Sequence, residues 1–158
     1  MQETLEAFLE QPTAKNYRAA RRLILADPEY RGDPRQLIEV ADLCEKRLFA
    51  DVAERIGEMM PDWALSPRVH AYAAWVATEE GDLEDAELER FMQRSCLQGL
   101  LSSGDGSREH PFLVMHVSDE YDILDCLRQD AQAQRLVAVG TRQFDVITAA
   151  DGQYWFGV

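Results

Sequence analysis

The sequence is poor in cysteine and in extended apolar segments, and each shortage excludes a class of protein. Its three cysteines, Cys44, Cys96 and Cys126, are an odd number and show no Cys-x-x-Cys spacing. They are therefore expected to be free thiols in a reducing compartment, packed as small hydrophobic residues on apolar helix faces. No apolar run approaches the ~18 residues of a membrane-spanning helix. The N-terminus carries acids where a secretion signal carries bases. We expect a cytoplasmic protein that does not enter a membrane.

Basic residues are also scarce. The chain has 158 residues, with 16 Lys and Arg against 29 Asp and Glu, and its formal net charge is −13. This balance argues against nucleic-acid binding through phosphates, which needs basic patches. It favours solubility and a partner protein with a basic surface. No pattern in the sequence sets an oligomeric state. The apolar fraction of 46% is that of a folded chain rather than a disordered one.

Residues 33–98 repeat their own pattern. The motif Asp33-Pro34-Arg35 returns 33 residues later as Ser66-Pro67-Arg68. In each copy the first residue is a suitable helix N-cap, and the proline lies in the first turn, where its missing N–H costs nothing. A period in the thirties is typical of stacked helical hairpins.

Three alanines follow the same interval, at Ala20, Ala53 and Ala86. We expect them to be equivalent, closely packed contacts between the two helices of each hairpin. Ile38 and Phe91 belong to the apolar helix faces that the spacing predicts. Helices are expected at about residues 2–10, 14–26, 34–44, 49–60, 67–80 and 83–97.

Because of these features, the segment of about residues 1–98 resembles the tetratricopeptide (TPR) family of helical-hairpin repeats. The turn Gly81-Asp82-Leu83 and the nearby Ala86 carry the resemblance, and Ala53 and Ala20 stand at the matching small-residue site. The resemblance implies a groove that binds other proteins. A plain antiparallel bundle with coincidental spacing is the alternative.

The C-terminal part has a different pattern. Ser102 to Ser107 is a polar, glycine-containing segment that ends the helical spacing. Strands are expected at residues 111–117, 136–139, 144–148 and 153–156, with a helix at 119–127 that Ser118 caps. The sequence therefore predicts an α+β fold in two parts. Residues 1–101 form a helical-hairpin region, and residues 102–158 form a small domain with a mainly antiparallel sheet and one helix.

Residues 104–158 resemble the C-terminal module of an uncharacterised bacterial protein family. The resemblance is carried by Gly104-Asp105-Gly106-Ser107, Pro111-Phe112, Val117-Ser118-Asp119-Glu120-Tyr121 and Tyr154-Trp155-Phe156. It implies a fold and no activity.

The aromatic end of the chain should have side chains on both faces of its sheet. Trp155 is expected on the face opposite Tyr154 and Phe156, because side chains alternate along a strand. A single helix covers one face only. We therefore expect Trp155 or its neighbours to pack on the helical part or on another chain.

Metal and cofactor sites are not expected. Gly104-Asp105-Gly106 lacks the further carboxylates of a calcium loop and the following helix of a phosphate loop, so it is interpreted as an interdomain turn. His70, His110 and His116 have no ligand spacing to one another or to a cysteine. His70 aligns with Leu37 of the preceding repeat, which indicates a packing or groove residue.

One segment departs clearly from an average surface. Seven acids and no base within eleven residues form an acidic run of Glu79, Glu80, Asp82, Glu84, Asp85, Glu87 and Glu89. The run is either a solvated turn and helix face or a docking surface for a basic partner.

Three functions are compatible with these features. The first is a non-catalytic protein–protein interaction module with no catalytic residues. The second is an acidic inhibitor or immunity-type protein that occludes a basic site. The third is an enzyme with a site between the two parts. A groove, a single acidic patch or a pocket with perturbed titratable groups would distinguish them.

Overall fold

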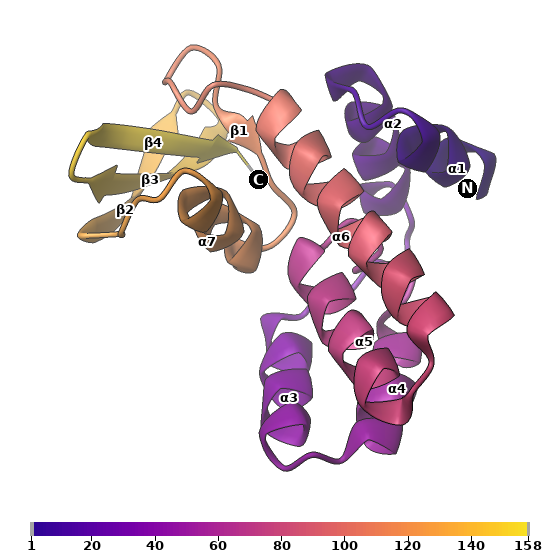
Figure 1. Ribbon diagram of the computed structural model, residues 1–158. Coiled ribbons are helices and arrows are strands. Elements are labelled where there is room, and N and C mark those ends of the chain that lie inside the picture. The colour runs from indigo at the N-terminus through magenta and orange to yellow at the C-terminus, as the bar shows by residue number, and fades with distance from the viewer. Residues whose placement is uncertain (1, 158) are drawn as a thin grey trace.

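The computed structural model describes residues 2–157 and has an α+β fold in that range, as predicted from the sequence. Within residues 2–157, six helices come before the four strands of a single sheet, and a seventh lies between the first two strands along the chain (Figure 1). The helices are α1 (Gln2–Glu10), α2 (Ala14–Leu25), α3 (Pro34–Glu45), α4 (Phe49–Met59), α5 (Pro67–Glu80), α6 (Leu83–Ser102) and α7 (Val117–Cys126). The strands are β1 (Phe112–Leu113), β2 (Ala133–Val139), β3 (Arg142–Ala149) and β4 (Gly152–Gly157). No helix within residues 2–157 is long and apolar enough to cross a membrane.

Helix boundaries follow the local chemistry that the sequence displays. Asp33 and Ser66 cap α3 and α5 through their side chains, each with a proline in the first turn. Gly81 ends α5 in a left-handed conformation with φ of 83°, which glycine adopts without strain. The Asp82 carboxylate accepts the Asp85 N–H and starts α6. These caps explain why α3, α5 and α6 begin at their predicted positions.

The longest helix, α6, organises the molecule. It packs antiparallel against α5 at one end, and α1 and α2 lie against its other end (Figure 1). The α3–α4 hairpin packs on α5 and has its own buried cluster, which includes Val40, Val52, Trp63 and Val69.

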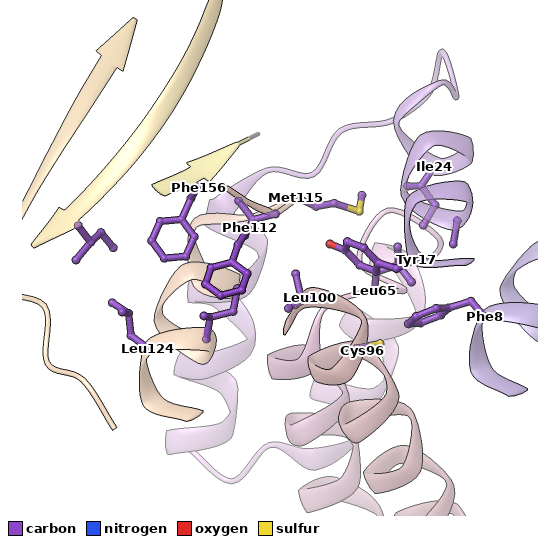
Figure 2. Packing of buried hydrophobic residues seen from close by; sticks show 14 residues of the cluster. Phe8, Tyr17, Ile24, Leu65, Cys96, Leu100, Phe112, Met115, Leu124 and Phe156 are labelled. Atoms are coloured by element: carbon purple, nitrogen blue, oxygen red, sulfur yellow. The ribbon is translucent and has the colours of Figure 1, made fainter. Parts of the chain in front are cut away.

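One hydrophobic core joins the two parts of the chain. It contains Phe8 and Tyr17 from the first two helices, Leu100 from α6, and Phe112 and Phe156 from the sheet (Figure 2). The Tyr17 hydroxyl donates a hydrogen bond to the carbonyl oxygen of Leu113 over 2.8 Å. The segments 1–101 and 102–158 therefore meet in a shared interior, and Phe156 makes the contact with the helical part that was expected of Trp155 or its neighbours.

The sheet has the strand order β1-β4-β3-β2. Strands β2, β3 and β4 form the expected antiparallel meander, and β1 adds to β4 in parallel with Phe112 opposite Phe156. The strand expected over residues 111–117 is shorter than predicted. It ends at Leu113, because α7 already begins at Val117.

Helix α7 covers one face of the sheet, where Ile123 and Leu124 share the core with Ile147 and Phe156 (Figure 1). Trp155 lies on the opposite face, as alternation predicts. It does not pack on the helical part. Phe144 meets its ring edge-on, and the Arg108 guanidinium lies over it at 5.5 Å.

Three predicted helical contacts are wrong. Ile38 is 67% exposed and Phe91 is 43% exposed. The buried faces of their helices are formed by other residues, among them Val40 and Cys96. Ala53 is exposed, whereas Ala20 and Ala86 are fully buried. The three alanines are therefore not equivalent packing sites, although they share one sequence interval.

Two predictions for α7 are also wrong. Its N-cap position is His116 rather than Ser118, and the Asp119 carboxylate accepts the N–H groups of Met115 and His116 over 3.0 Å each. Cys126 is exposed near the end of the helix, while Cys44 and Cys96 are buried as expected.

Candidate functional site

A groove of about 330 Å³ runs between α4, α5 and the start of α6. Its floor is made of small and apolar side chains, and its rim is acidic. The lining residues are Ala53, Ile56, Gly57, Met60, Ala73, Val76, Ala77, Glu80, Asp82, Asp85 and Glu89. We call this the acidic groove.

Small residues on α4 create the groove. Ala53 and Gly57 are one helical turn apart and exposed, so no bulky side chain fills the space in front of α5. A Cβ atom added at Gly57 would meet no atom within 4 Å. The interval of 33 residues predicted a closely packed helix contact at Ala53, and this prediction is wrong. Ala53 borders an open groove instead.

The acidic run predicted as a docking surface divides into two groups. Glu80, Asp82, Asp85 and Glu89 line the acidic groove, whereas Glu79, Glu84 and Glu87 do not. Glu79 is bound elsewhere: its carboxylate pairs with the Arg47 guanidinium over 2.5 Å and accepts the Trp75 indole N–H.

Like charges crowd the groove rim. Partial burial and the carboxylates of Glu89 and Asp82 raise the pKa of Asp85 above its usual value. Within the part of the chain that the structure describes, Glu80, Asp82 and Asp85 form no ion pair with a basic side chain. A cation in the groove would therefore meet three carboxylates without displacing a protein cation.

A second, apolar cavity of about 280 Å³ continues the groove. The two share Met60 and Glu89. The remaining lining comes from α1, the segment after α4, and α5 and α6, through Leu5, Phe8, Leu9, Ala64, Leu65, His70 and Met92. An extended ligand could therefore place polar groups at the acidic rim and an apolar group against α1.

His70 lies at the junction of the two cavities and is buried, as its predicted packing role requires. Its Nδ1 is 2.6 Å from the Glu89 carboxylate, and its Nε2 is 3.0 Å from the carbonyl oxygen of Ala64. Both partners are acceptors, so both ring nitrogens carry protons. Burial opposes that charge, but the neighbouring Cys96 and Glu89 side chains outweigh it and raise the pKa of His70 to about 10. Burial also raises the pKa of the Cys96 thiol, which leaves Glu89 as the anion that balances the imidazolium.

This ion pair gives Glu89 a structural role. Its side chain is only 19% exposed and its charge is compensated. With both nitrogens donating, His70 has no lone pair to act as a general base. The pair therefore positions the junction between the two cavities rather than performing acid–base chemistry.

A second cluster of titratable groups, which the sequence patterns did not single out, lies at the N-terminal half of α7. Asp119 and Glu120 are almost completely buried. Burial raises the pKa of Asp119 to about 7, and burial together with the Asp145 carboxylate raises that of Glu120 to about 8. Asp122 forms an ion pair with Arg68 of α5, whose Nε lies 2.9 Å from Oδ1.

His116 completes this cluster. Its ring stacks on Trp63 with centroids 3.7 Å apart, and burial lowers its pKa to about 4, so it is neutral. The Trp63–His116 and Arg68–Asp122 contacts both connect the helical part to α7. The cluster thus joins the two parts of the fold. In the sequence, Asp119 and Glu120 belong to the segment Val117-Ser118-Asp119-Glu120-Tyr121 that carries the resemblance to the bacterial family, but no pattern there indicated their burial.

Among residues 2–157, no group of three or more His, Cys, Asp or Glu side chains is arranged to hold a metal ion. Comparison of the chain with protein-family models, with curated proteins and with solved structures gave no match.

Proposed function

We propose that this chain is a non-catalytic protein-binding module that holds a basic, partly apolar segment of a partner protein in the acidic groove. The observation that carries the proposal is the composition of the groove, which combines an apolar floor with three uncompensated carboxylates, those of Glu80, Asp82 and Asp85. The resemblance to TPR hairpins supports the same function.

The chemistry of the groove defines the partner. Apolar side chains would pack on Ala53, Ile56 and Gly57, where the hydrophobic effect favours contact. Lysine or arginine side chains beside them would reach the rim. Charge complementarity of this kind increases the association rate and selects against acidic competitors.

The adjoining apolar cavity supplies a second contact. A bulky apolar side chain of the partner fits beyond Met60, between α1 and α6, where Leu5, Leu9 and Met92 line the wall. The preferred ligand is therefore a segment with cationic residues followed or preceded by one apolar anchor.

The inhibitor hypothesis is less well supported. An inhibitor that occludes a basic site should present its acids as one free patch. Here Glu79 is tied to Arg47 and Glu89 to His70, and the free carboxylates surround a groove.

Titration with a short synthetic peptide of alternating leucine and lysine tests the proposal. Glu80→Gln with Asp85→Asn should weaken binding about tenfold, because two rim charges are lost. The matched control, Glu84→Gln with Glu87→Gln, removes the same charge outside the groove and should change affinity less than about twofold. Equal losses in both pairs would mean that net charge, not the groove, attracts the peptide.

A substitution in the floor separates the groove from general electrostatics. Gly57→Leu adds a side chain that meets no atom of the folded chain at its Cβ and should fill the groove. We expect loss of peptide binding with an unchanged or higher melting temperature, since leucine also favours the helix. Full binding by this variant would contradict the proposal.

A further inference from the structure

A cavity of about 430 Å³ lies where α2, the end of α6, the following loop and β3 meet. In Figure 1 this is the region around the loop that links α6 to β1. Three guanidinium groups from distant parts of the sequence, those of Arg18, Arg108 and Arg142, line it together with His110. We call this the arginine cavity.

Each of the three arginines is positioned by a neutral group. Arg18 donates a hydrogen bond to the carbonyl oxygen of Ser103 over 2.8 Å. The Arg108 guanidinium carbon lies 5.5 Å from the centre of the Trp155 ring, and that of Arg142 lies 5.2 Å from the centre of the Phe144 ring. Stacking and a single carbonyl contact leave most of the five N–H donors of each guanidinium free for a ligand.

The other eleven arginines of the chain divide into two groups. In the described part of the chain, residues 2–157, six of them form no ion pair: Arg21, Arg22, Arg90, Arg94, Arg128 and Arg135. Carboxylates pair with the guanidinium groups of Arg31, Arg35, Arg47, Arg55 and Arg68. Within residues 2–157 no ion pair involves the three arginines of the cavity. What distinguishes Arg18, Arg108 and Arg142 is therefore their position: in a chain of net charge −13, these three uncompensated cations line one cavity.

The positive surface extends along α2. This helix carries Lys15, Arg18, Arg21 and Arg22 and no acid. A neighbouring cavity of about 360 Å³ shares Arg18 and adds Arg21 and Arg22 to its lining. The Arg21 guanidinium is held by two hydrogen bonds to the carbonyl oxygen of Val114.

Two carboxylates also line the arginine cavity, those of Asp105 and Glu109. Asp105 is engaged in its own turn, because its carboxylate accepts the Ser107 N–H over 2.9 Å, and hydrogen bonding to Ser107 lowers its pKa. Both carboxylates count as charged, so three arginines against two carboxylates leave the lining with a formal charge of +1. Pro111, Leu113 and Phe144 form its apolar wall.

We propose that the arginine cavity binds a small organic molecule with two or more oxyanion groups, either phosphates or carboxylates. Guanidinium groups recognise both through paired N–H donors. Three arginines in one lining favour a polyanion over a single charge, and the apolar wall accommodates a carbon skeleton. The site is separate from the acidic groove and does not depend on the function proposed for it.

Nuclear magnetic resonance titrations with pyrophosphate and with citrate, at ionic strength held constant with sodium chloride, test this site. The indole N–H of Trp155 is the reporter, because Arg108 lies over its ring. We expect saturable shifts with at least one probe. Pyrophosphate binding alone would identify a phosphate ligand, and citrate binding alone a carboxylate ligand. Linear, non-saturating shifts with both would overturn the proposal.

Paired substitutions locate the binding. Arg108→Gln with Arg142→Gln should raise the dissociation constant about tenfold or more, because two charge-assisted contacts are lost. Arg90→Gln with Arg94→Gln removes the same charge from α6 and should change it less than about twofold. Equal effects of the two pairs would contradict a specific site.

Lysine variants cover the case in which the glutamine pair loses stability. Arg108→Lys with Arg142→Lys keeps both charges but removes the planar donor pairs, so affinity should fall several-fold while folding is retained. Unchanged affinity in this variant would show that the guanidinium geometry does not form the site, and the proposal would be wrong.

Discussion

Two acidic segments of this chain lie in opposite environments, one exposed to water and one buried. The run from Glu79 to Glu89 lies on the surface around the α5–α6 turn, and most of its carboxylates face water. The acids at the start of α7, Asp119, Glu120 and Asp122, lie between the helical part and the sheet. The first segment has more acids, seven against three, yet the second has the more strongly perturbed pKa values. The number of acids in a segment therefore does not indicate how strongly the fold alters the pKa of each carboxyl group.

The physical cause is the position of α7. It packs on α5 and α6 on one side and belongs to the sheet domain on the other, so its N-terminal half has little access to water. Burial disfavours the charged form of a carboxyl group. Asp119 is partly compensated by two backbone N–H groups and Asp122 by Arg68. Glu120 receives only a 3.3 Å hydrogen bond from Gln134.

The largest expected effect concerns the pH dependence of stability. Glu120 has a pKa of about 8 when folded and about 4.5 when unfolded, so the folded state holds its proton more tightly. Stability is therefore highest below the lower value and falls as pH rises towards 8. Glu120→Gln should match the parent at pH 4 and exceed its unfolding free energy by about 2–4 kcal/mol at pH 9.

Urea denaturation at both pH values measures this difference. Glu84→Gln is the matched control from the exposed run, and its pH profile should follow that of the parent protein. If the two variants show the same profile, Glu120 is not desolvated and the contrast between the segments disappears.

The second expected effect tests the one member of the exposed run that turns inward. Glu89→Gln removes the anion that balances the His70 imidazolium and should cost about 1–3 kcal/mol, since a buried charge loses its partner. The pKa of His70, followed by its ring proton resonances, should fall. Glu87→Gln, two residues away and exposed, should stay within about 0.5 kcal/mol of the parent. An unshifted His70 would show that Glu89 does not hold its proton.

The smallest expected effect concerns two adjacent acids at the C-terminus of α5, whose substitution by lysine should change the free energy of unfolding in opposite directions. Glu80→Lys should raise the free energy of unfolding by about 0.3–1 kcal/mol at low salt, because a cation suits that end of the helix dipole. Glu79→Lys should lower it by up to about 1 kcal/mol, because the contact with Arg47 becomes repulsive.

Thermal melts at low and high salt measure both changes. The gain for Glu80→Lys should fade as salt screens it. A gain for Glu79→Lys as well would show that its ion pair with Arg47 contributes nothing in solution.

Much of the local structure could be predicted from short-range chemistry. The caps at Asp33 and Ser66 and the turn at Gly81 depend on neighbouring residues, so their predicted positions were correct. The antiparallel meander was also predicted correctly. Of the candidate site, the acidic run was correctly located on the surface, but which of its members border a groove was not predictable.

The amino-acid sequence alone specified the features that depend on neighbouring residues. These are the helices, the caps at Asp33 and Ser66, the antiparallel meander of β2, β3 and β4, and with them the α+β class. The tertiary structure determined which residues are exposed and which are buried against another segment of the chain. It left Ala53 exposed beside a groove, turned Glu89 towards His70, and buried Asp119 and Glu120 beneath the sheet. It also brought Arg18, Arg108 and Arg142 to one cavity. Local patterns do not carry this information, because burial and electrostatic environment depend on the packing of segments that lie far apart along the chain.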